Sequence, residues 1–317
     1  MDALSDVLRA VRLSGAVFFD VRARDPWVAA TPAGRAIVGA MFPGSGHLIS
    51  YHVLIAGSCW AGPPQAPPIH LHAGDIIVFP HGDPHMLSST PGMRTEADLS
   101  MYRPPRDGQL PFGISMGSGG EEAARFVCGF LGCDARPFNP LLAALPPVIH
   151  VSDRSGALAP YVQAALAESR APRIGGDGVL ARLSELMFVS AVRQYLESLP
   201  PESNDWLAGL KDPHVGRALN LMHASPARAW NLASLARAVG LSRSALAEHF
   251  TRFVGRPPMQ YLAHWRMQLA AGQLRVSRDS VAVIAERVGY ESEAAFSRSF
   301  KKIMGASPGQ WRGRPGP

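Results

Sequence analysis

The chain has 317 residues, of which 47% are hydrophobic and 18% are charged, and it carries a formal net charge of +6. This length and composition indicate a globular protein of two domains and exclude a disordered or fibrous chain. Three cysteines are too few for the disulfide framework of a small secreted protein, so we expect a reducing, cytoplasmic location. Residues 36–74 contain no charged side chain, but prolines, glycines and histidines interrupt them, so we expect no membrane span.

The first domain is expected over residues 1–150. Residues 15–135 within it are rich in Gly and Pro and contain short runs of β-favouring residues, such as 48–56 and 75–79. Short strands separated by turn residues predict a small antiparallel β-barrel.

One motif in this segment is similar to a known barrel. Gly74, Pro80, Gly82 and His85 have the spacing G-x5-P-x-G-x2-H, which resembles the second motif of the cupin barrel. The first glycine and the Pro-Gly turn bracket a short strand, and the resemblance places His85 inside the barrel. The domain is therefore expected to be cupin-like.

The first cupin motif is only partly present. Gly46 and His52 match its start, but Leu54 stands at the position of its second histidine. Ser58 or Cys59 stands at the position of its glutamate. The usual metal-binding set of a cupin is therefore broken.

Two interpretations of the remaining candidate ligands stay open. In the first, His52, Cys59 and His85 bind a metal ion, with Cys128 as a further ligand; thiolate and imidazole together favour zinc over iron. In the second, the histidines are hydrogen-bonded residues of the barrel interior and the cysteines are small buried apolar side chains.

A helical hairpin and a linker are expected over residues 151–212. Apolar residues recur at helical spacing over 158–169 and again over 179–199, which predicts two antiparallel helices. Such a hairpin can form the contact of a homodimer or can pack only on its own barrel. The Pro-rich segment 200–204 is the expected hinge.

Positive charge is concentrated in the last third of the chain. Residues 213–317 contain 15 Lys and Arg against 5 Asp and Glu, whereas residues 1–212 contain 16 against 20. A compact basic unit of this kind is typical of binding to a phosphate backbone or an acidic membrane, although a merely solvated basic face has the same composition.

The same region contains an internal repeat with an offset of 50 residues, which aligns Phe250 with Phe300. In the first copy, a short amphipathic helix over 232–239 is expected to stop at Gly240. A second helix is expected to begin after Ser242, which can serve as its N-cap. Two short helices joined at a glycine predict a helix-turn-helix, and the repeat predicts a second one.

The second copy is expected to run from 281 to 288, to turn at Gly289 and to restart after Ser292. A long helix over 258–274 joins the two copies. If it sets their second helices about 34 Å apart, both can enter successive major grooves of B-DNA. The expected partner is therefore double-stranded DNA and not a membrane.

The repeat resembles a known family of proteins. The resemblance is carried by the segment 292–311, which reads SEAAFSRSFKKIMGASPGQW and looks like the second helix-turn-helix of AraC/XylS-type transcription regulators. It extends over 213–317 and includes Arg266 of the connecting helix. One departure is Pro257 before Pro258, where such proteins have a small hydroxyl residue, so one N-cap is lost.

The resemblance implies an α+β protein with an N-terminal cupin-like barrel and hairpin and, over 213–317, an all-α double helix-turn-helix. The implied function is a sequence-specific transcription regulator whose barrel senses a small molecule or a metal. Its implied partners are promoter or operator DNA, an effector, a second copy of the chain and RNA polymerase. The alternative is a metal-dependent cupin enzyme with an accessory DNA-binding tail, which the broken metal set disfavours.

Side chains near the start of each second helix must reach the base edges. By resemblance, Arg298 lies at one of the base-reading positions, where a guanidinium can bind guanine or, alternatively, a phosphate. The basic residues of both helices are otherwise expected to bind phosphates. The expected DNA-binding set is Ser242, Arg243, Ser244, Ala247, Glu248, Arg252, Glu293, Ala294, Ser297, Arg298, Lys301 and Lys302.

Overall fold

The computed structural model describes residues 2–11, 13, 18–102, 112–133, 138–153, 156–171 and 173–313. The chain divides into two compact units. The first, here called the sheet unit, consists of Leu13–Cys133 and Leu145–Ser198, and the second, the helical unit, consists of Met1–Arg12, Asp134–Ala144 and Leu199–Pro317. None of the helices in the described ranges is long and apolar enough to cross a membrane.

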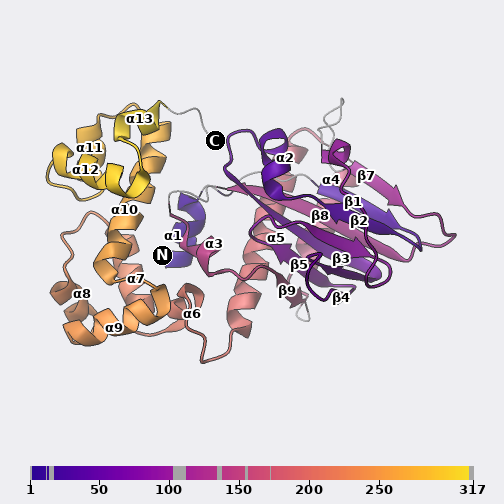
Figure 1. The fold of residues 1–317 in the computed structure, drawn as a ribbon, viewed down its shortest axis with the longest axis horizontal. Helices are drawn as coiled ribbons and strands as arrows, with labels where there is room; N and C mark the ends of the chain where they lie inside the picture. Colours follow the sequence, from indigo (N-terminus) through magenta and orange to yellow (C-terminus); the bar gives the residue numbers. More distant parts are fainter. Residues whose placement is uncertain are drawn as a thin grey trace. The chain divides into compact units, whose positions relative to one another are not determined.

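The described part of the sheet unit contains nine strands (Figure 1). They are β1 (Phe18–Ala23), β2 (Val28–Thr31), β3 (His47–Gly62), β4 (Ile69–His72), β5 (Asp75–Phe79), β6 (His85–Ser88), β7 (Phe112–Met116), β8 (Ala124–Cys133) and β9 (Ile149–Ser152). The predicted strand over 75–79 is confirmed, and the predicted run 48–56 is the first part of β3. The expected barrel range of 15–135 also includes 103–111, which lies outside the described residues.

The long strand β3 organises this sheet. Its first part pairs with β8 and β5, and its last five residues pair with β4 and β6. The register on β8 shifts between Leu54 and Ala56, where an irregularity lets the strand pass from one set of partners to the other. The architecture is a cupin-like half-barrel. It is not purely antiparallel, because β1 pairs in parallel with β7.

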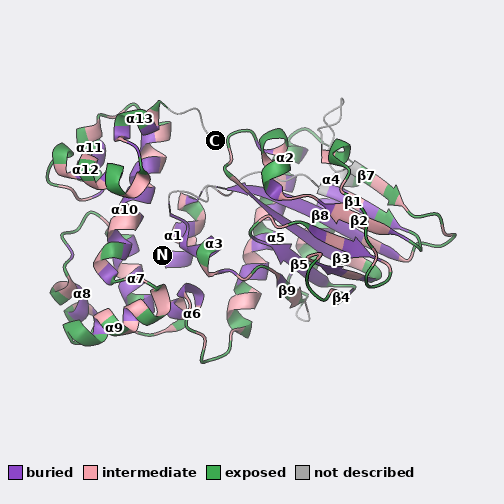
Figure 2. Ribbon diagram, in the orientation of Figure 1, coloured by how far each residue is buried: buried purple, intermediate pink, exposed green. Residues whose placement is uncertain are grey.

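The core of the sheet unit lies between its strands, and Figure 2 shows buried residues concentrated on them. Phe79, Phe126 and Phe130 are among its largest fully buried side chains. Two further helical segments, α2 (Gly34–Met41) and the short 3-10 helix η1 (Leu99–Tyr102), were not predicted. They complete the half-barrel around its interior.

The predicted hairpin is present as α4 (Ala159–Arg170) and α5 (Gly176–Ser198). It belongs to the sheet unit, where α5 packs against β5, β8 and β9. The hydroxyl groups of Tyr51 on β3 and Ser184 on α5 lie 2.7 Å apart and are hydrogen-bonded in a buried place. The hairpin therefore has its own barrel as a packing partner.

The helical unit is built from short helices around one long one. Its helices are α1 (Ala3–Ala10), α3 (Pro140–Ala144), α6 (Trp206–Lys211), α7 (Val215–Ala224), α8 (Leu232–Val239), α9 (Arg243–Val254), α10 (Pro258–Val276), α11 (Val281–Arg287), α12 (Glu293–Met304) and α13 (Pro308–Arg312). Figure 1 shows α10 running between the α8–α9 pair and the α11–α12 pair. The doubled helix-turn-helix and the connecting helix are therefore present as predicted.

The units do not follow the expected boundaries at residues 150 and 212. Helix α1 packs against α7 and α10 of the helical unit because its apolar face, with Ala3, Leu4 and Val7, is buried there. The backbone N–H of Ala3 also donates a hydrogen bond to Asn220 Oδ1 at 2.8 Å. The start of the chain is thus part of the helical unit.

The segment Asp134–Ala144 belongs to the helical unit as well. The backbone N–H of Phe138 donates to Gln268 Oε1 at 3.1 Å, and Gln268 Nε2 donates to the carbonyl of Ala10 at 3.3 Å. One side chain of α10 therefore holds both added segments. Neither segment carries the repeat, so the expected range of 213–317 did not include them.

Candidate nucleic-acid interface and ligand cavity

The second helix of each helix-turn-helix begins at a side-chain cap. Ser242 accepts a hydrogen bond from the backbone N–H of Ala245, and Ser292 does the same for Ala295. The turn before α9 is closed by Gly240, whose φ of 77° is a left-handed conformation suited to glycine. As the departure at Pro257 implies, α10 begins without a side-chain cap.

The predicted DNA-binding set lies on the surface of these two helices. Ala247 and Ser297 are half-buried, and the other ten residues of the set are exposed. The opposite faces hold the core, with Leu246 and Phe250 in α9 and Phe296 and Phe300 in α12. The helical spacing therefore separates a packing face from a face that is available to a partner.

Four cations of this set are free to meet phosphates or bases. The side chains of Arg243, Arg298, Lys301 and Lys302 form no ion pair or hydrogen bond with another described residue. Arg252 differs, because its Nη2 donates to the ring of His249 at 3.0 Å. A free guanidinium or ammonium has no competing partner to give up when it binds an anion.

Arg266 on α10 links the loop before the first helix-turn-helix to the second motif. Its Nε donates to the carbonyl of Pro226 at 2.7 Å, one Nη donates to Arg228 O at 2.8 Å, and the other to Gly289 O at 3.3 Å. This side chain therefore ties the loop after α7 to the turn of the second motif. The contact is close, because a Cβ on Gly289 would lie 2.5 Å from the carbonyl oxygen of Ala227.

In the sheet unit, the predicted ligands form a buried chain of hydrogen bonds. His52 Nδ1 lies 2.8 Å from Cys128 Sγ, and His52 Nε2 lies 2.7 Å from His85 Nε2. The Nδ1 of His85 lies 2.8 Å from the carbonyl oxygen of Asp83, which can only accept. His85 Nδ1 therefore carries the proton, His52 Nε2–H donates to His85 Nε2, and the thiol of Cys128 donates to His52 Nδ1.

Burial keeps the hydrogen-bonded side chains of Cys128, His52 and His85 uncharged. It lowers the pKa of His85 to about 4 and the pKa of His52 well below its usual value. It also raises the pKa of the Cys128 thiol. Neutral imidazoles and a neutral thiol are the forms that the hydrogen-bond directions require.

The predicted metal set is not assembled around one point. His52 directs its two ring nitrogens at two different partners, and Cys59, also buried, takes no part in the chain of hydrogen bonds. Within the described ranges, no group of three or more His, Cys, Asp or Glu side chains is placed to hold a metal ion. The arrangement does not fit a metal and agrees with the second interpretation, of hydrogen-bonded barrel histidines.

Metal removal gives a direct check of this geometry. We expect a chelator to leave the melting temperature of the full chain unchanged, because the described side chains form no group that is placed to bind a metal ion. A structural zinc contributes about 10 kcal/mol or more to folding, so its loss would be obvious. Stoichiometric zinc that disappears in both His52→Ala and Cys59→Ala would instead establish the predicted site.

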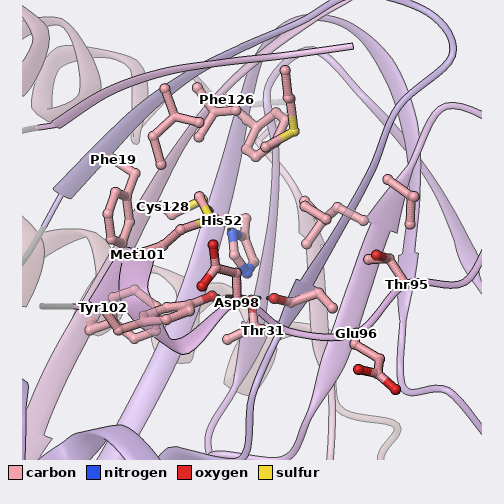
Figure 3. Close-up of a pocket in the computed structure, with 18 residues that line it drawn as sticks. Phe19, Thr31, His52, Thr95, Glu96, Asp98, Met101, Tyr102, Phe126 and Cys128 are labelled. Atoms are coloured by element: carbon pink, nitrogen blue, oxygen red, sulfur yellow. Dashed lines mark hydrogen bonds between the residues drawn. The ribbon is translucent and has the colours of Figure 1, made fainter.

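A cavity of about 210 Å³ lies within the sheet unit, beside the hydrogen-bonded side chains of His52 and Cys128 (Figure 3). His52 and Cys128 line it, together with aromatic side chains from several elements. Phe19 and Phe130 of the lining meet edge to face, with ring centroids 6.0 Å apart. Mostly apolar walls with a few polar groups are typical of a small-molecule site.

Comparisons with known proteins agree with both units. The chain matches the Cupin family over residues 2–197 and the family described as Helix-turn-helix domain over residues 235–314. A putative AraC-like transcription regulator of Streptomyces lividans is 32% identical, over 99% of each chain. The chain belongs to the AraC family of transcription regulators.

A second relative of this AraC-family chain covers almost its full length, and a solved structure matches its DNA-binding part. The HTH-type transcriptional regulator AlkR of Acinetobacter baylyi is 27% identical over 98% of this chain and 99% of its own. Among solved structures, the DNA-binding domain of AdpA in complex with a target DNA is 27% identical over 32% of this chain and 90% of its own, with a TM-score of 0.31. The chain is a DNA-binding transcription regulator with a cupin domain, as its family matches and its relatives indicate.

Several residues of this AraC-family regulator that matter for the site were missed by the sequence analysis. The cavity walls include Tyr102 from η1 and Asp98 from the preceding loop. Neither belongs to a periodic run or a motif, so no sequence signal points to them. The role of Arg266 in linking the loop before α8 to the second motif could not be predicted either, since its partners are backbone carbonyls.

Proposed function

We propose that this chain is an effector-responsive regulator that binds a specific operator sequence as a homodimer. The observation that carries the proposal is the pair of capped reading helices, α9 and α12, each with its apolar face buried and its polar and basic face exposed. Arg266 supports a fixed relation between them through its bonds to the loop that leads into α8 and to the turn before α12. Two reading helices per chain would give a dimer four contacts with two half-sites. RNA polymerase is a further proposed partner.

The hairpin offers a surface for the second copy. Ile174 in the turn and Val179 and Leu186 on α5 are large apolar side chains that are exposed. Val179 and Leu186 are seven residues apart and therefore share one face of the helix. This face supports a helix-to-helix contact between two sheet units.

The sheet offers a route from the cavity to this hairpin. His52 lines the cavity, and the neighbouring residue on β3, Tyr51, points to the other face and bonds Ser184 on α5. The ring of Tyr51 lies over Gly129 of β8, next to Cys128. A ligand that shifts β3 against β8 would therefore shift α5 and the proposed dimer contact.

Substitution of Arg298 tests the proposed sequence-specific binding. A duplex selected from a random pool by the full chain would be titrated with the native protein, with Arg298→Ala and with Arg217→Ala. Arg217 is an exposed arginine of α7 without a side-chain partner among the described residues, so it controls for the loss of charge. We expect Arg298→Ala to weaken binding to the selected duplex by about 1–3 kcal/mol. Duplexes changed at one base pair should show that the variant no longer discriminates between bases at a single position.

The control is expected to change binding by less than about 0.5 kcal/mol. If Arg298→Ala weakens binding to all duplexes equally and lowers only the salt dependence, the residue binds a phosphate and not a base. If no duplex is preferred by the native protein, the proposed operator recognition fails.

A further inference from the structure

The charged residues among the described lining of the sheet-unit cavity are all acidic. Among its described lining residues, the groups with a formal charge at neutral pH are the carboxylates of Asp98 and Glu96, and no Lys or Arg lines the cavity. In Figure 3, the carboxylate of Asp98 is drawn in the middle of the lining side chains and that of Glu96 at their edge, and both residues are exposed to solvent. Neither carboxylate forms an ion pair with another described residue. An anionic ligand would meet repulsion here, and a cation would meet two unpaired partners.

The carboxylate of Asp98 is held in its charged form and in its place. Its Oδ1 accepts hydrogen bonds from the backbone N–H of Ser100 at 2.9 Å and from the Ser100 hydroxyl at 2.7 Å. These bonds lower the pKa of Asp98 below its usual value. The second carboxylate oxygen is left for a ligand.

The other described residues that line the cavity add no positive charge. His52 is neutral because burial lowers its pKa well below the usual value, and its Nδ1 accepts a hydrogen bond from the Cys128 thiol. Tyr102 keeps its proton, because burial raises its pKa to about 12. The rings of Phe19, Tyr102 and Phe126 supply apolar contact, and aromatic faces also attract cations.

We propose that the effector of this cavity is an organic cation, an ammonium group on a compact apolar body, with the ammonium at Asp98 and the apolar part among the aromatic walls. The proposal rests on the proposed function, in which this cavity is the effector site. A cavity near 150 Å³ binds benzene, so the space of about 210 Å³ accommodates about nine non-hydrogen atoms. This is the size of a phenyl ring with a short alkyl amine.

Three probes with the same phenylethyl group separate charge from apolar contact: phenethylammonium, phenethyl alcohol of equal size, and the slightly larger hydrocinnamate. Their binding to the full chain would be measured by titration calorimetry. We expect phenethylammonium to bind about tenfold more tightly than the alcohol and hydrocinnamate to bind most weakly. Asp98→Asn keeps an acceptor for Ser100 and removes the charge, so it should abolish the preference for the cation. Asp177→Asn, an exposed carboxylate of α5 outside the cavity, should preserve it.

The possible failures are distinguishable. If the alcohol or hydrocinnamate binds as tightly as phenethylammonium, or if Asp98→Asn leaves the preference intact, the inference of a cationic effector is overturned while the cavity keeps its proposed role. Ala30→Trp fills part of the cavity wall, and it should weaken all three probes. If Ala30→Trp leaves probe binding unchanged, the probes bind elsewhere and the proposed effector role of the cavity is overturned. If no probe binds the native chain, the inference of a cationic effector of this size is overturned, and the proposed binding of operator DNA is unaffected.

Discussion

Replacing Gly289 by alanine is expected to destabilise the helical unit by about 3 kcal/mol. Gly289 has a φ of 84°, which costs a residue with a Cβ about 1–2 kcal/mol. Its Cβ would also lie 2.5 Å from Ala227 O and 2.7 Å from Ala227 Cα, so backbone has to move. The neighbouring carbonyls of Pro226 and Arg228 accept from Arg266, and the displacement therefore loosens the link between the loop before α8 and the second motif. The check is urea unfolding followed by the helical circular dichroism signal.

The corresponding turn of the first motif provides a matched control. Gly240 has nearly the same φ, 77°, but no atom lies within 4 Å of the position that its Cβ would take. Gly240→Ala should therefore cost only the conformational part, about 1–2 kcal/mol. We also expect DNA binding to fall more in Gly289→Ala than in Gly240→Ala. Equal costs for the two substitutions would show that the contact with Ala227 contributes nothing.

The parts of the fold that local chemistry determines could be predicted from the sequence. Ser242 and Ser292 cap helices where they were expected to, and Gly240 ends α8 in a left-handed conformation. These features depend on a few neighbouring residues and on the helical period of the apolar face. The exposed faces of α9 and α12 follow from the same period, which is why the predicted DNA-binding residues lie on the surface.

What could not be predicted depends on contacts between distant segments. Helix α1 was missed because eight residues with Ala3, Leu4 and Val7 on one face give a weak signal, and only α7 and α10 make that face a packing surface. The aromatic cavity was missed for a similar reason. Its walls come from β-strands and from η1, whose contributions to one space are visible only after folding.

The predicted ligand residues show a limit of motif spacing. Spacing correctly placed His85 inside the barrel, where it is fully buried. It could not show that His52 lies between His85 and Cys128 and bonds both. Whether imidazoles share a metal or bond each other depends on the directions of their ring nitrogens, which the order of residues does not reveal.

The helical unit is expected to lose stability in mild acid through His223. Burial lowers the pKa of His223 to about 3 in the folded chain, whereas it is about 6.5 when unfolded. Above pH 6.5 the His223 imidazole is neutral in the folded and in the unfolded chain, so its burial costs no stability there. As the pH falls below 6.5, the unfolded chain takes up a proton that the folded chain does not, until the pH reaches about 3. The free energy of unfolding should therefore fall by about 1.4 kcal/mol per pH unit in this window.

The contacts of His223 define a variant that removes this dependence. Its Nε2 lies 2.8 Å from the hydroxyl of Tyr261, its ring stacks on Trp265 and its Nδ1 has no hydrogen-bond partner. The carboxylate of Asp6 is 4.0 Å from that nitrogen, so an ionised Asp6 opposes the burial effect only in part. His223→Gln retains an acceptor for Tyr261 and cannot take up the proton.

This variant should be less stable than the native chain at neutral pH, because the stacking on Trp265 is lost. Between about pH 6.5 and about pH 4.5 the free energy of unfolding of the variant should fall less steeply than that of the native chain. The two slopes should differ by about 1.4 kcal/mol per pH unit. Urea unfolding at several pH values measures both slopes, with His264→Gln on α10 as a control that keeps the native slope. If His223→Gln and the native chain have parallel profiles, His223 takes up its proton without unfolding, and burial does not hold it neutral.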